Sequence, residues 1–255
     1  MATHSPQKKF AFRICLMAIS SILFFTSCKK QTDVLDTALL SDYYPLQVGN
    51  YINYNLDSTL YVNFGRTQIT ASYKVQDRID AQITDNQGRL SYRIVRYQRK
   101  TDNDPWVPKN TFMATPTDNA IEYVENNLRY IKLHAPVVQD FSWKGNRFIN
   151  TTGIDPDLRY MEDWDYVYDS VGYPLTINAL QFDSTIKVFE RDQFDGDPPK
   201  PTSTGYAEKT YSMEKYAKGV GLIFREFLHW EYQPPSSPFP GYTGYGVRLT
   251  ITGHN

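Results

Sequence analysis

The chain has 255 residues, of which 41% are hydrophobic, 22% are charged and 15% are aromatic, and its formal net charge is -1. This composition excludes collagen, coiled coils and polytopic membrane proteins, and two cysteines are too few for a disulfide scaffold. A near-neutral chain also lacks the basic surface that phosphate backbones require, so we expect no nucleic-acid partner.

Residues 1–27 are predicted to be a lipoprotein signal peptide. A basic start is followed by an uncharged apolar run at residues 14–25, which is shorter than the roughly 20 residues of a membrane-spanning helix. The run ends in the sequence FTSC at residues 25–28, which resembles the bacterial lipobox with Phe25 in place of the usual leucine. We therefore expect cleavage before Cys28 and acylation of its sulfur. Ordinary cleavage near Ser27, which would leave a free thiol, is the alternative.

The residues after Cys28 bear on where the anchor is sorted. Lipoproteins that the Bacteroidota export to the cell surface resemble one another in carrying an acidic cluster directly after the lipidated cysteine. Lys29, Lys30 and a single later acid, Asp33, do not match it. We therefore expect attachment to the outer membrane, through acyl chains on Cys28, with the protein facing the periplasm. Residues 28–42 are predicted to be a lipidated tether, and residues 43–255 a single β-rich domain.

Apolar and polar residues alternate along most of the predicted domain, which indicates half-buried antiparallel strands. The alternating segments are residues 52–57, 69–76, 180–188, 222–232 and 247–252. Asn126-Asn127 predicts a hairpin between Ala120–Glu125 and Leu128–His134, and Gly65 and Gly88 mark further turns. The sequence therefore predicts an all-β fold of about ten strands, in a single antiparallel sheet that curls into a barrel or half-barrel.

Little helix is expected in the domain. Residues 155–168 and 208–218 are the two segments predicted to supply a short helix. Residues 195–204 and 233–244 are rich in proline and glycine and are predicted to be loops.

Two motifs at the ends of the domain resemble uncharacterised envelope lipoproteins of the Bacteroidota. The first is YYPLxxGxY at residues 43–51, and the second is YAKGVGLI at residues 216–223. The resemblance implies an envelope-bound β-rich domain, like the half-barrels of lipoprotein carriers, and implies no catalytic residue. Independently of it, Gly219 and Gly221 predict a strand entry that needs positive φ or a close approach to another backbone.

The common catalytic motifs are absent from the sequence, so we predict no catalytic residue, no cofactor and no metal. His229 and Glu231 share one side of a predicted strand, but two ligands are too few for zinc. The acids between Asp192 and Asp197 do not have EF-hand spacing, which favours a polar loop.

Two other groups of residues suggest glycan chemistry. Glu162, Asp163 and Asp165 lie among aromatic residues, as the paired carboxylates of a glycosidase do, although an acidic loop over an aromatic core explains them as well. Four tryptophans either stack on a ligand or pack in the core. They are Trp106, Trp143, Trp164 and Trp230.

Four Ser or Thr residues follow an aspartate and precede a methyl-bearing residue, which resembles the O-glycosylation motif of Bacteroidota envelope proteins. They are Thr37, Ser58, Ser170 and Ser184. Asp-Ser and Asp-Thr pairs are also ordinary turn formers, so both readings stay open.

An aromatic-rich domain without catalytic motifs indicates a non-catalytic, lipid-anchored cell-envelope protein that binds a small or lipidic ligand in a concave sheet. Two alternatives remain open at this stage. One is a structural or accessory subunit of an envelope protein complex, which would dock through the two Pro-rich loops. The other is a glycan-active enzyme that uses the acids at residues 162–165.

Overall fold

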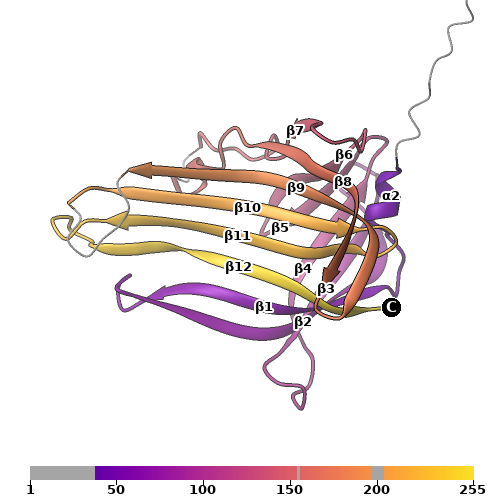
Figure 1. The fold of residues 1–255 in the computed structure, drawn as a ribbon, viewed down its shortest axis with the longest axis horizontal. Helices are drawn as coiled ribbons and strands as arrows, with labels where there is room; N and C mark the ends of the chain where they lie inside the picture. The colour runs from indigo at the N-terminus through magenta and orange to yellow at the C-terminus, as the bar shows by residue number, and fades with distance from the viewer. Residues whose placement is uncertain (1–37, 154–155, 197–203) are drawn as a thin grey trace, which may run out of the picture. The chain divides into compact units, whose positions relative to one another are not determined.

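In a computed structural model of the protein, which describes residues 38–153, 156–196 and 204–255, twelve strands form one antiparallel sheet (Figure 1). The signal peptide, Cys28 and Thr37 of the sequence predictions lie outside the described residues. The elements are the helix α2 (Leu40–Tyr43), β1 (Tyr51–Val62), β2 (Thr67–Thr84), β3 (Leu90–Arg99), β4 (Val107–Pro116), β5 (Ala120–Glu125), β6 (Leu128–His134), β7 (Ser142–Lys144), the 3-10 helix η2 (Pro156–Met161), β8 (Asp165–Ile177), β9 (Leu180–Gly196), β10 (Ala207–Ala217), β11 (Gly221–Gln233) and β12 (Gly241–His254).

The sheet is an up-and-down meander that nearly closes into a barrel, as the sequence predicts. The strand order is β6-β5-β4-β3-β2-β1-β12-β11-β10-β9-β8-β7. Strands β1 and β12 pair with each other, so the first and last strands lie side by side and the two edges of the sheet are β6 and β7. The predicted hairpin is confirmed as β5 and β6, and Asn126 and Asn127 both adopt the positive φ of a tight hairpin turn.

One backbone bond and several side-chain bonds join β6 to β7 and β8 in place of a strand-to-strand ladder. The Ile131 amide of β6 donates to the Gly145 carbonyl at 2.8 Å, and the Trp143 indole Nε1 donates to the Ile131 carbonyl at 2.8 Å. The Tyr168 hydroxyl accepts a hydrogen bond from the His134 amide at 3.0 Å and donates to the His134 carbonyl at 2.8 Å. These bonds satisfy edge groups that would otherwise be open to pairing with another chain.

Three sequence expectations about local structure are wrong or incomplete. Residues 208–218 are not helical and form most of strand β10, and residues 155–168 contain only the 3-10 turn η2 before β8 begins at Asp165. The predicted loop at residues 233–244 is shorter than expected, because β12 begins at Gly241, and β9 extends to Gly196, two residues into the other predicted loop. Ala38 and Leu40, which the sequence places in the predicted tether, pack against the core.

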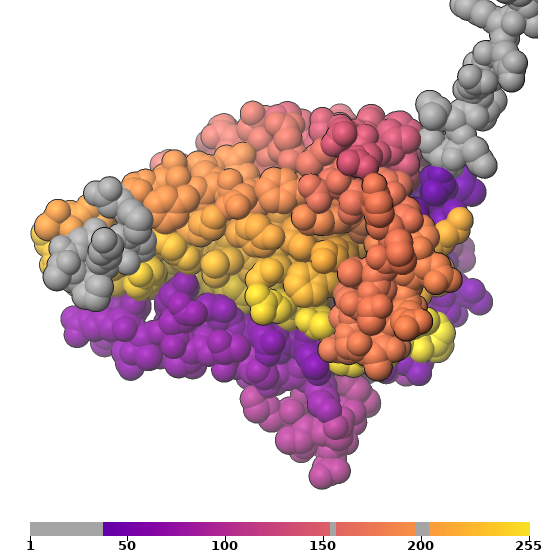
Figure 2. Space-filling model, viewed as in Figure 1, coloured from indigo at the N-terminus to yellow at the C-terminus, as the bar shows by residue number. Residues whose placement is uncertain are grey.

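The hairpin formed by β8 and β9 bends over the ends of β10, β11 and β12 (Figures 1 and 2). Phe182 of this hairpin is buried in one cluster with Ile223 and Ile251, and the side-chain Nδ2 of Asn178 donates to the Ile251 carbonyl at 2.9 Å. No described helix is both long and apolar enough to cross a bilayer.

Candidate ligand-binding site

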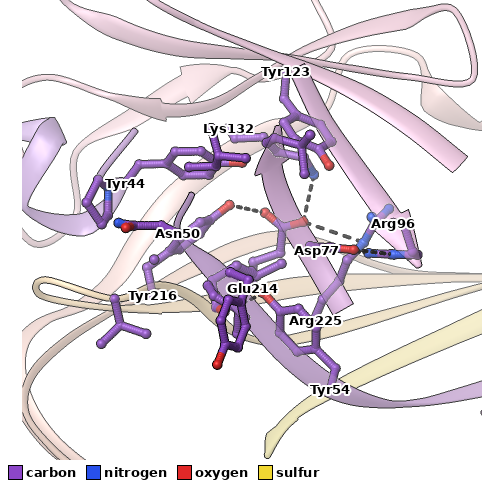
Figure 3. A pocket seen from close by; sticks show the side chains of 18 of the residues that line it. Tyr44, Asn50, Tyr54, Asp77, Arg96, Tyr123, Lys132, Glu214, Tyr216 and Arg225 are labelled. Carbon is purple, nitrogen blue, oxygen red and sulfur yellow. Dashed lines mark hydrogen bonds and ion pairs between the residues drawn. The ribbon is translucent and has the colours of Figure 1, made fainter. Parts of the chain in front are cut away.

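A cavity of about 80 Å³ lies where β1 begins, β12 ends and β10 turns into β11. Because one water needs only about 10–15 Å³ by this measure, the cavity has room for several waters or for a ligand of few non-hydrogen atoms. Its walls combine tyrosines, aliphatic side chains and charged groups (Figure 3). The lining residues are Tyr44, Pro45, Asn50, Tyr51, Ile52, Tyr54, Asp77, Ile79, Ile94, Arg96, Tyr123, Lys132, Glu214, Tyr216, Gly219, Val220, Gly221, Leu222, Arg225 and Asn255.

Lys132 lies between two buried carboxylates on one side of the cavity. Its Nζ donates to Glu214 at 2.8 Å and to Glu190 at 3.2 Å, and all three side chains are at most 5% exposed. The remaining oxygen of Glu214 accepts from the Tyr216 hydroxyl, and that of Glu190 accepts from the Ser212 hydroxyl. Each oxygen of the two carboxylates therefore has a donor, as buried charges require.

Burial and charge set the protonation of this cluster. Burial and the nearby charge of Glu214 raise the pKa of Glu190 to about 7. Burial acts on Glu214 in the same direction, but Lys132 and Arg225 outweigh it and hold the pKa of that carboxyl below its ordinary value. Burial would lower the pKa of Lys132, but the two carboxylates outweigh it, so the pKa of Lys132 is raised. Glu190 is therefore the member of the cluster that exchanges a proton near neutral pH.

Two arginines complete the charged wall. Arg96 donates through Nε and Nη2 to the two oxygens of Asp77, each at 2.6 Å, so this pair is bidentate. Arg225 donates through Nη1 to Glu125 at 2.8 Å, but its buried Nε makes no hydrogen bond. The nearest acceptor to that Nε is a Glu214 oxygen at 3.5 Å, which is beyond good hydrogen-bond length.

The tyrosines of the cavity differ in whether their hydroxyls make hydrogen bonds with other residues. Tyr54 donates to the Leu222 carbonyl at 2.8 Å, and Tyr216 donates to Glu214. The hydroxyls of Tyr44 and Tyr123 make no hydrogen bond with another described residue. Burial raises the pKa of Tyr44 and of Tyr123 well above the ordinary value, so both stay protonated donors at neutral pH. The cavity wall therefore presents unused hydrogen-bond donors.

The glycine motif of the sequence lies at this cavity. Gly219 and Gly221 have φ of +76° and +110°, as the predicted strand entry requires, and both line the cavity. The Gly219 amide donates to the Asp42 carbonyl at 2.6 Å, which fixes the turn to α2. The predicted close approach is thus a contact between this turn and the segment that leads into β1.

The four tryptophans are not brought together. Trp143 and Trp164 are buried, and their indole nitrogens donate to the carbonyls of Ile131 and Tyr160, so neither presents a free ring face. Trp106 lies under the Arg99 guanidinium at 4.3 Å, and Trp230 packs between Phe194 and Tyr242. A stacking role remains a prediction for Trp106 and Trp230, which are half-buried.

The acids at residues 162–165 are exposed rather than gathered in a cleft. Asp163 and Asp165 both form ion pairs with Lys144, at 2.7 and 2.9 Å, and their side chains are 76% and 63% exposed. The Lys144 ammonium holds the pKa of Asp163 below its ordinary value, whereas a glycosidase general acid needs a raised pKa. This arrangement does not supply the pair of carboxyl groups that the glycosidase hypothesis requires.

Ser58, Ser170 and Ser184 lie within strands and are half-buried. The Ser184 hydroxyl is hydrogen-bonded to the Tyr43 hydroxyl at 2.9 Å, so an attached sugar would replace this contact. Glycosylation of these residues remains a prediction.

The described part of the chain contains no group of three His, Cys, Asp or Glu side chains arranged to hold a metal ion. His229, a weak candidate in the sequence, stacks on Tyr160 at 3.6 Å and pairs with the Thr210 hydroxyl through Nδ1. Burial lowers its pKa to about 4, so His229 is neutral at physiological pH.

The sequence predictions miss Lys132, Glu190, Glu214 and Arg225 as site residues. Each is a charged residue on a strand, where a charged side chain is ordinarily assigned to the solvated face. Lys132 carries the one usable signal, because it stands between Ile131 and Leu133 in a strand whose hairpin is predicted. No family model matches the sequence, and comparison with curated proteins finds none of significant similarity.

Proposed function

We propose that this protein is a non-catalytic, lipid-anchored protein of the bacterial cell envelope that holds a small polar ligand inside its barrel. The observation that carries the proposal is the cavity itself, whose lining includes Tyr44 and Tyr123, two tyrosines with hydroxyls that make no hydrogen bond with another described residue. Ligand sites typically combine apolar walls with a few convergent polar groups, as this cavity does. Because the cavity of about 80 Å³ is too small for a fatty acyl chain, we propose a small ligand rather than a lipid.

The described chain begins at the cavity end of the barrel. Helix α2, the C-terminus and the turn between β10 and β11 lie at the same end of the barrel (Figure 1). The ten residues from Cys28 to Ala38 span at most about 35 Å when extended. We propose that acyl chains on Cys28 attach the protein to the periplasmic face of the outer membrane.

The anchor is tested by the intact mass of the protein purified from its own cells. We expect the loss of residues 1–27 and the added mass of acyl chains, and we expect a Cys28→Ala variant to leave the membrane fraction. A polypeptide that keeps Met1 or carries no acyl group would contradict the anchor.

Ligand binding is tested by native mass spectrometry of the same preparation. We expect a small molecule to be released from the wild-type protein but not from an Ile52→Trp variant, because Ile52 lines the cavity and tryptophan fills it. Ile69→Trp is the matched control, since Ile69 is 42% exposed and does not line the cavity. Equal release from both variants would contradict binding in the cavity.

A role as an accessory subunit is the second candidate, favoured by two hairpin tips. Phe64 and Phe239 are 93% and 85% exposed at the tips of β1–β2 and β11–β12. The Tyr242 amide donates to the Gly65 carbonyl at 2.9 Å, so the two tips are tied together. We expect a Phe64→Ser, Phe239→Ser variant to lose a crosslinked envelope partner that an Ile69→Ser variant keeps. An unchanged crosslinking pattern would exclude this surface.

A further inference from the structure

We infer that the free edge of β2 at residues 67–73 binds an extended, acidic peptide segment of another protein, which adds to the sheet as a further strand. Strand β2 pairs with β1 from Thr67 onward, whereas β3 pairs with it only from Lys74 to Thr84. Residues 67–73 are exposed or half-buried, and among the described residues they have no partner strand on the β3 side (Figure 1). None of them lines the cavity, so the occupant of this edge does not depend on the ligand proposed there.

The direction of the backbone groups along β2 is set by its pairing with β1. In an antiparallel strand the amide and carbonyl of one residue point to the same side, and successive residues alternate between the two sides. The Ile79 carbonyl accepts from the Gly49 amide and the Ile79 amide donates to the Asn50 carbonyl, both at 2.9 Å, and this segment leads into β1. Odd-numbered residues of β2 therefore face β1, and even-numbered residues face away from it.

Three residues of the edge thus point their backbone groups outward, namely Gln68, Thr70 and Ser72. The Ser72 carbonyl accepts a hydrogen bond from Nζ of Lys100 at 2.7 Å, which confirms its direction. The amides and carbonyls of Gln68 and Thr70 have no described strand to pair with. An added strand would satisfy these groups with a regular ladder, as in other cases of strand addition to a sheet edge.

The composition of this edge distinguishes it from the other unpaired strand edges of the described barrel. Free edges are ordinarily protected by prolines, glycines, charged residues or β-bulges. Residues 67–73 have the sequence TQITASY and pair with β1 without a register shift, so the edge contains none of these features. The other long unpaired stretches are each protected: residues 107–112 by Pro108 and Lys109, residues 169–177 by Gly172, Pro174 and register shifts, and residues 190–196 by four charged residues.

An exposed cation without a carboxylate partner flanks the edge at each end. Arg66 directly precedes the edge and forms no ion pair with a described residue. At the other end the Lys100 ammonium contacts the Ser72 carbonyl and lies 4.6 Å from the centre of the Tyr73 ring, and it too has no carboxylate among the described residues. Both side chains are open to solvent, so a partner can reach them.

The carboxylates beside this edge are already engaged. Asp102 forms ion pairs with both Lys74 and Arg99, and Asp57 accepts a hydrogen bond from the Ser72 hydroxyl at 2.6 Å. A partner strand that bonds the Ser72 carbonyl releases the ammonium that now occupies it, and a carboxylate at the end of that strand would take up this charge. An acidic residue at each end of a segment of about seven residues therefore complements the edge.

A second copy of the chain fits this edge less well. Two copies that pair along the full length of residues 67–73 in antiparallel fashion would place Arg66 of one copy opposite Lys74 of the other. Like charges directly opposite each other destabilise a pair of strands. The charges thus favour a different, acidic chain over self-association.

The test is an NMR titration of the protein with the peptide ETVTVTE, acetylated and amidated at its ends, and with the peptide KTVTVTK. Each reads the same in both directions, so ETVTVTE tests parallel and antiparallel addition at once. We expect ETVTVTE to shift the Gln68 and Thr70 amide resonances and to slow the hydrogen exchange of both amides. At low ionic strength, where charges are least screened, we expect it to bind at least tenfold more tightly than KTVTVTK.

A pair of variants at Thr70 tests the backbone contact. Thr70→Pro removes the outward amide, which an edge strand tolerates because that amide does not pair with β1, and Thr70→Val keeps it. We expect Thr70→Pro to weaken ETVTVTE binding at least tenfold and Thr70→Val to leave the Kd unchanged, with the Tm of both close to that of the wild type.

A second variant tests the charges without changing the strand. In an Arg66→Glu, Lys100→Glu variant we expect the preference to reverse, so that KTVTVTK binds more tightly than ETVTVTE. Arg147→Glu is the control, because Arg147 is exposed in the loop after β7 and forms no ion pair with a described residue. We expect this control to keep the wild-type preference.

Three results would overturn the assignment. Strand addition is excluded if ETVTVTE leaves the Gln68 and Thr70 amides unshifted, or if it binds the Thr70→Pro and Thr70→Val variants equally well. An acidic partner is excluded if the two peptides bind the wild-type protein equally well. A protein that dimerises by itself in sedimentation velocity, and becomes monomeric in the Thr70→Pro variant, would assign the edge to a second copy.

Discussion

At the scale of single residues, Lys132 holds together the largest concentration of buried charge in the described barrel. It is the cation shared by Glu190 and Glu214, and both carboxylates are at most 2% exposed as side chains. In a Lys132→Met variant both would be left without their ammonium partner, which costs about 3–5 kcal/mol for a broken buried pair. We expect urea unfolding to report a loss of this size at pH 8 and a smaller loss at pH 5.5, where Glu190 is protonated.

Lys144→Met is the matched control for this prediction. Lys144 also serves two carboxylates, Asp163 and Asp165, but the three side chains are between 46% and 76% exposed. Exposed ion pairs contribute little because water already solvates both partners. We expect no measurable change in the urea midpoint, and a loss as large as that of the Lys132 variant would show that burial is not the cause.

At the scale of the elements, the barrel is closed by one backbone bond and by side-chain bonds to the backbone of β6. The Tyr168 hydroxyl is both acceptor and donor for the His134 backbone, so Tyr168→Phe leaves two edge groups without a partner. Each unsatisfied buried polar group costs about 1–3 kcal/mol. We expect a lower Tm and faster hydrogen exchange of the His134 amide, measured by NMR, with Tyr173→Phe unchanged. Equal protection of His134 in both variants would mean that the hydroxyl does not close the edge.

Two glycines test how the hairpin tips are fixed to their neighbours. Gly65 and Gly88 both have φ of +77°, so alanine costs each turn about 1–2 kcal/mol of backbone strain. A Cβ at Gly65 would lie 2.2 Å from the Tyr242 carbonyl oxygen, whereas a Cβ at Gly88 would meet nothing within 4 Å. We expect Gly65→Ala to lower the free energy of unfolding more than Gly88→Ala and to break the bond between the Tyr242 amide and the Gly65 carbonyl. Equal losses by urea unfolding would rule out the steric contact.

At the scale of the whole molecule, the sequence predicts the fold better than it predicts the site. The reason is that strands with an apolar inner face are recognised from their pattern, whereas strands with polar inner residues are not. Strands with an apolar inner face alternate clearly, as in β1 with Tyr54 and Leu56, and they are predicted. Strand β10 places Thr210, Ser212 and Glu214 in the interior, so its pattern does not resemble a half-buried strand and suggests a helix instead. Glu214, one of the polar residues that make the strand hard to recognise, also lines the cavity and belongs to a cluster of buried charges. Its partners on β6, β9 and β11 are distant in sequence, so only the register of the closed sheet brings them together.

The pH dependence of folding follows from two buried groups that titrate in opposite senses. The pKa of Glu190 is about 7 in the folded state, above its ordinary value of 4.5. The folded protein therefore binds more protons than the unfolded chain between these values, and this contribution to stability is lost as the pH rises. The pKa of His229 is lowered from 6.5 to about 4, so its contribution increases as the pH rises through that range.

The two effects oppose each other between pH 4.5 and 6.5, so the wild-type protein should show a shallow dependence there. Removing either group leaves the pH dependence of the free energy of unfolding that the other group causes. In a Glu190→Gln variant we expect the free energy of unfolding to increase from pH 5 to pH 6.5, because His229 alone remains. In a His229→Asn variant, which keeps a partner for the Thr210 hydroxyl, we expect it to decrease from pH 5 to pH 7. Urea unfolding at half-unit steps of pH measures both slopes, and parallel curves for the two variants would show that neither group titrates in the folded barrel as its surroundings require.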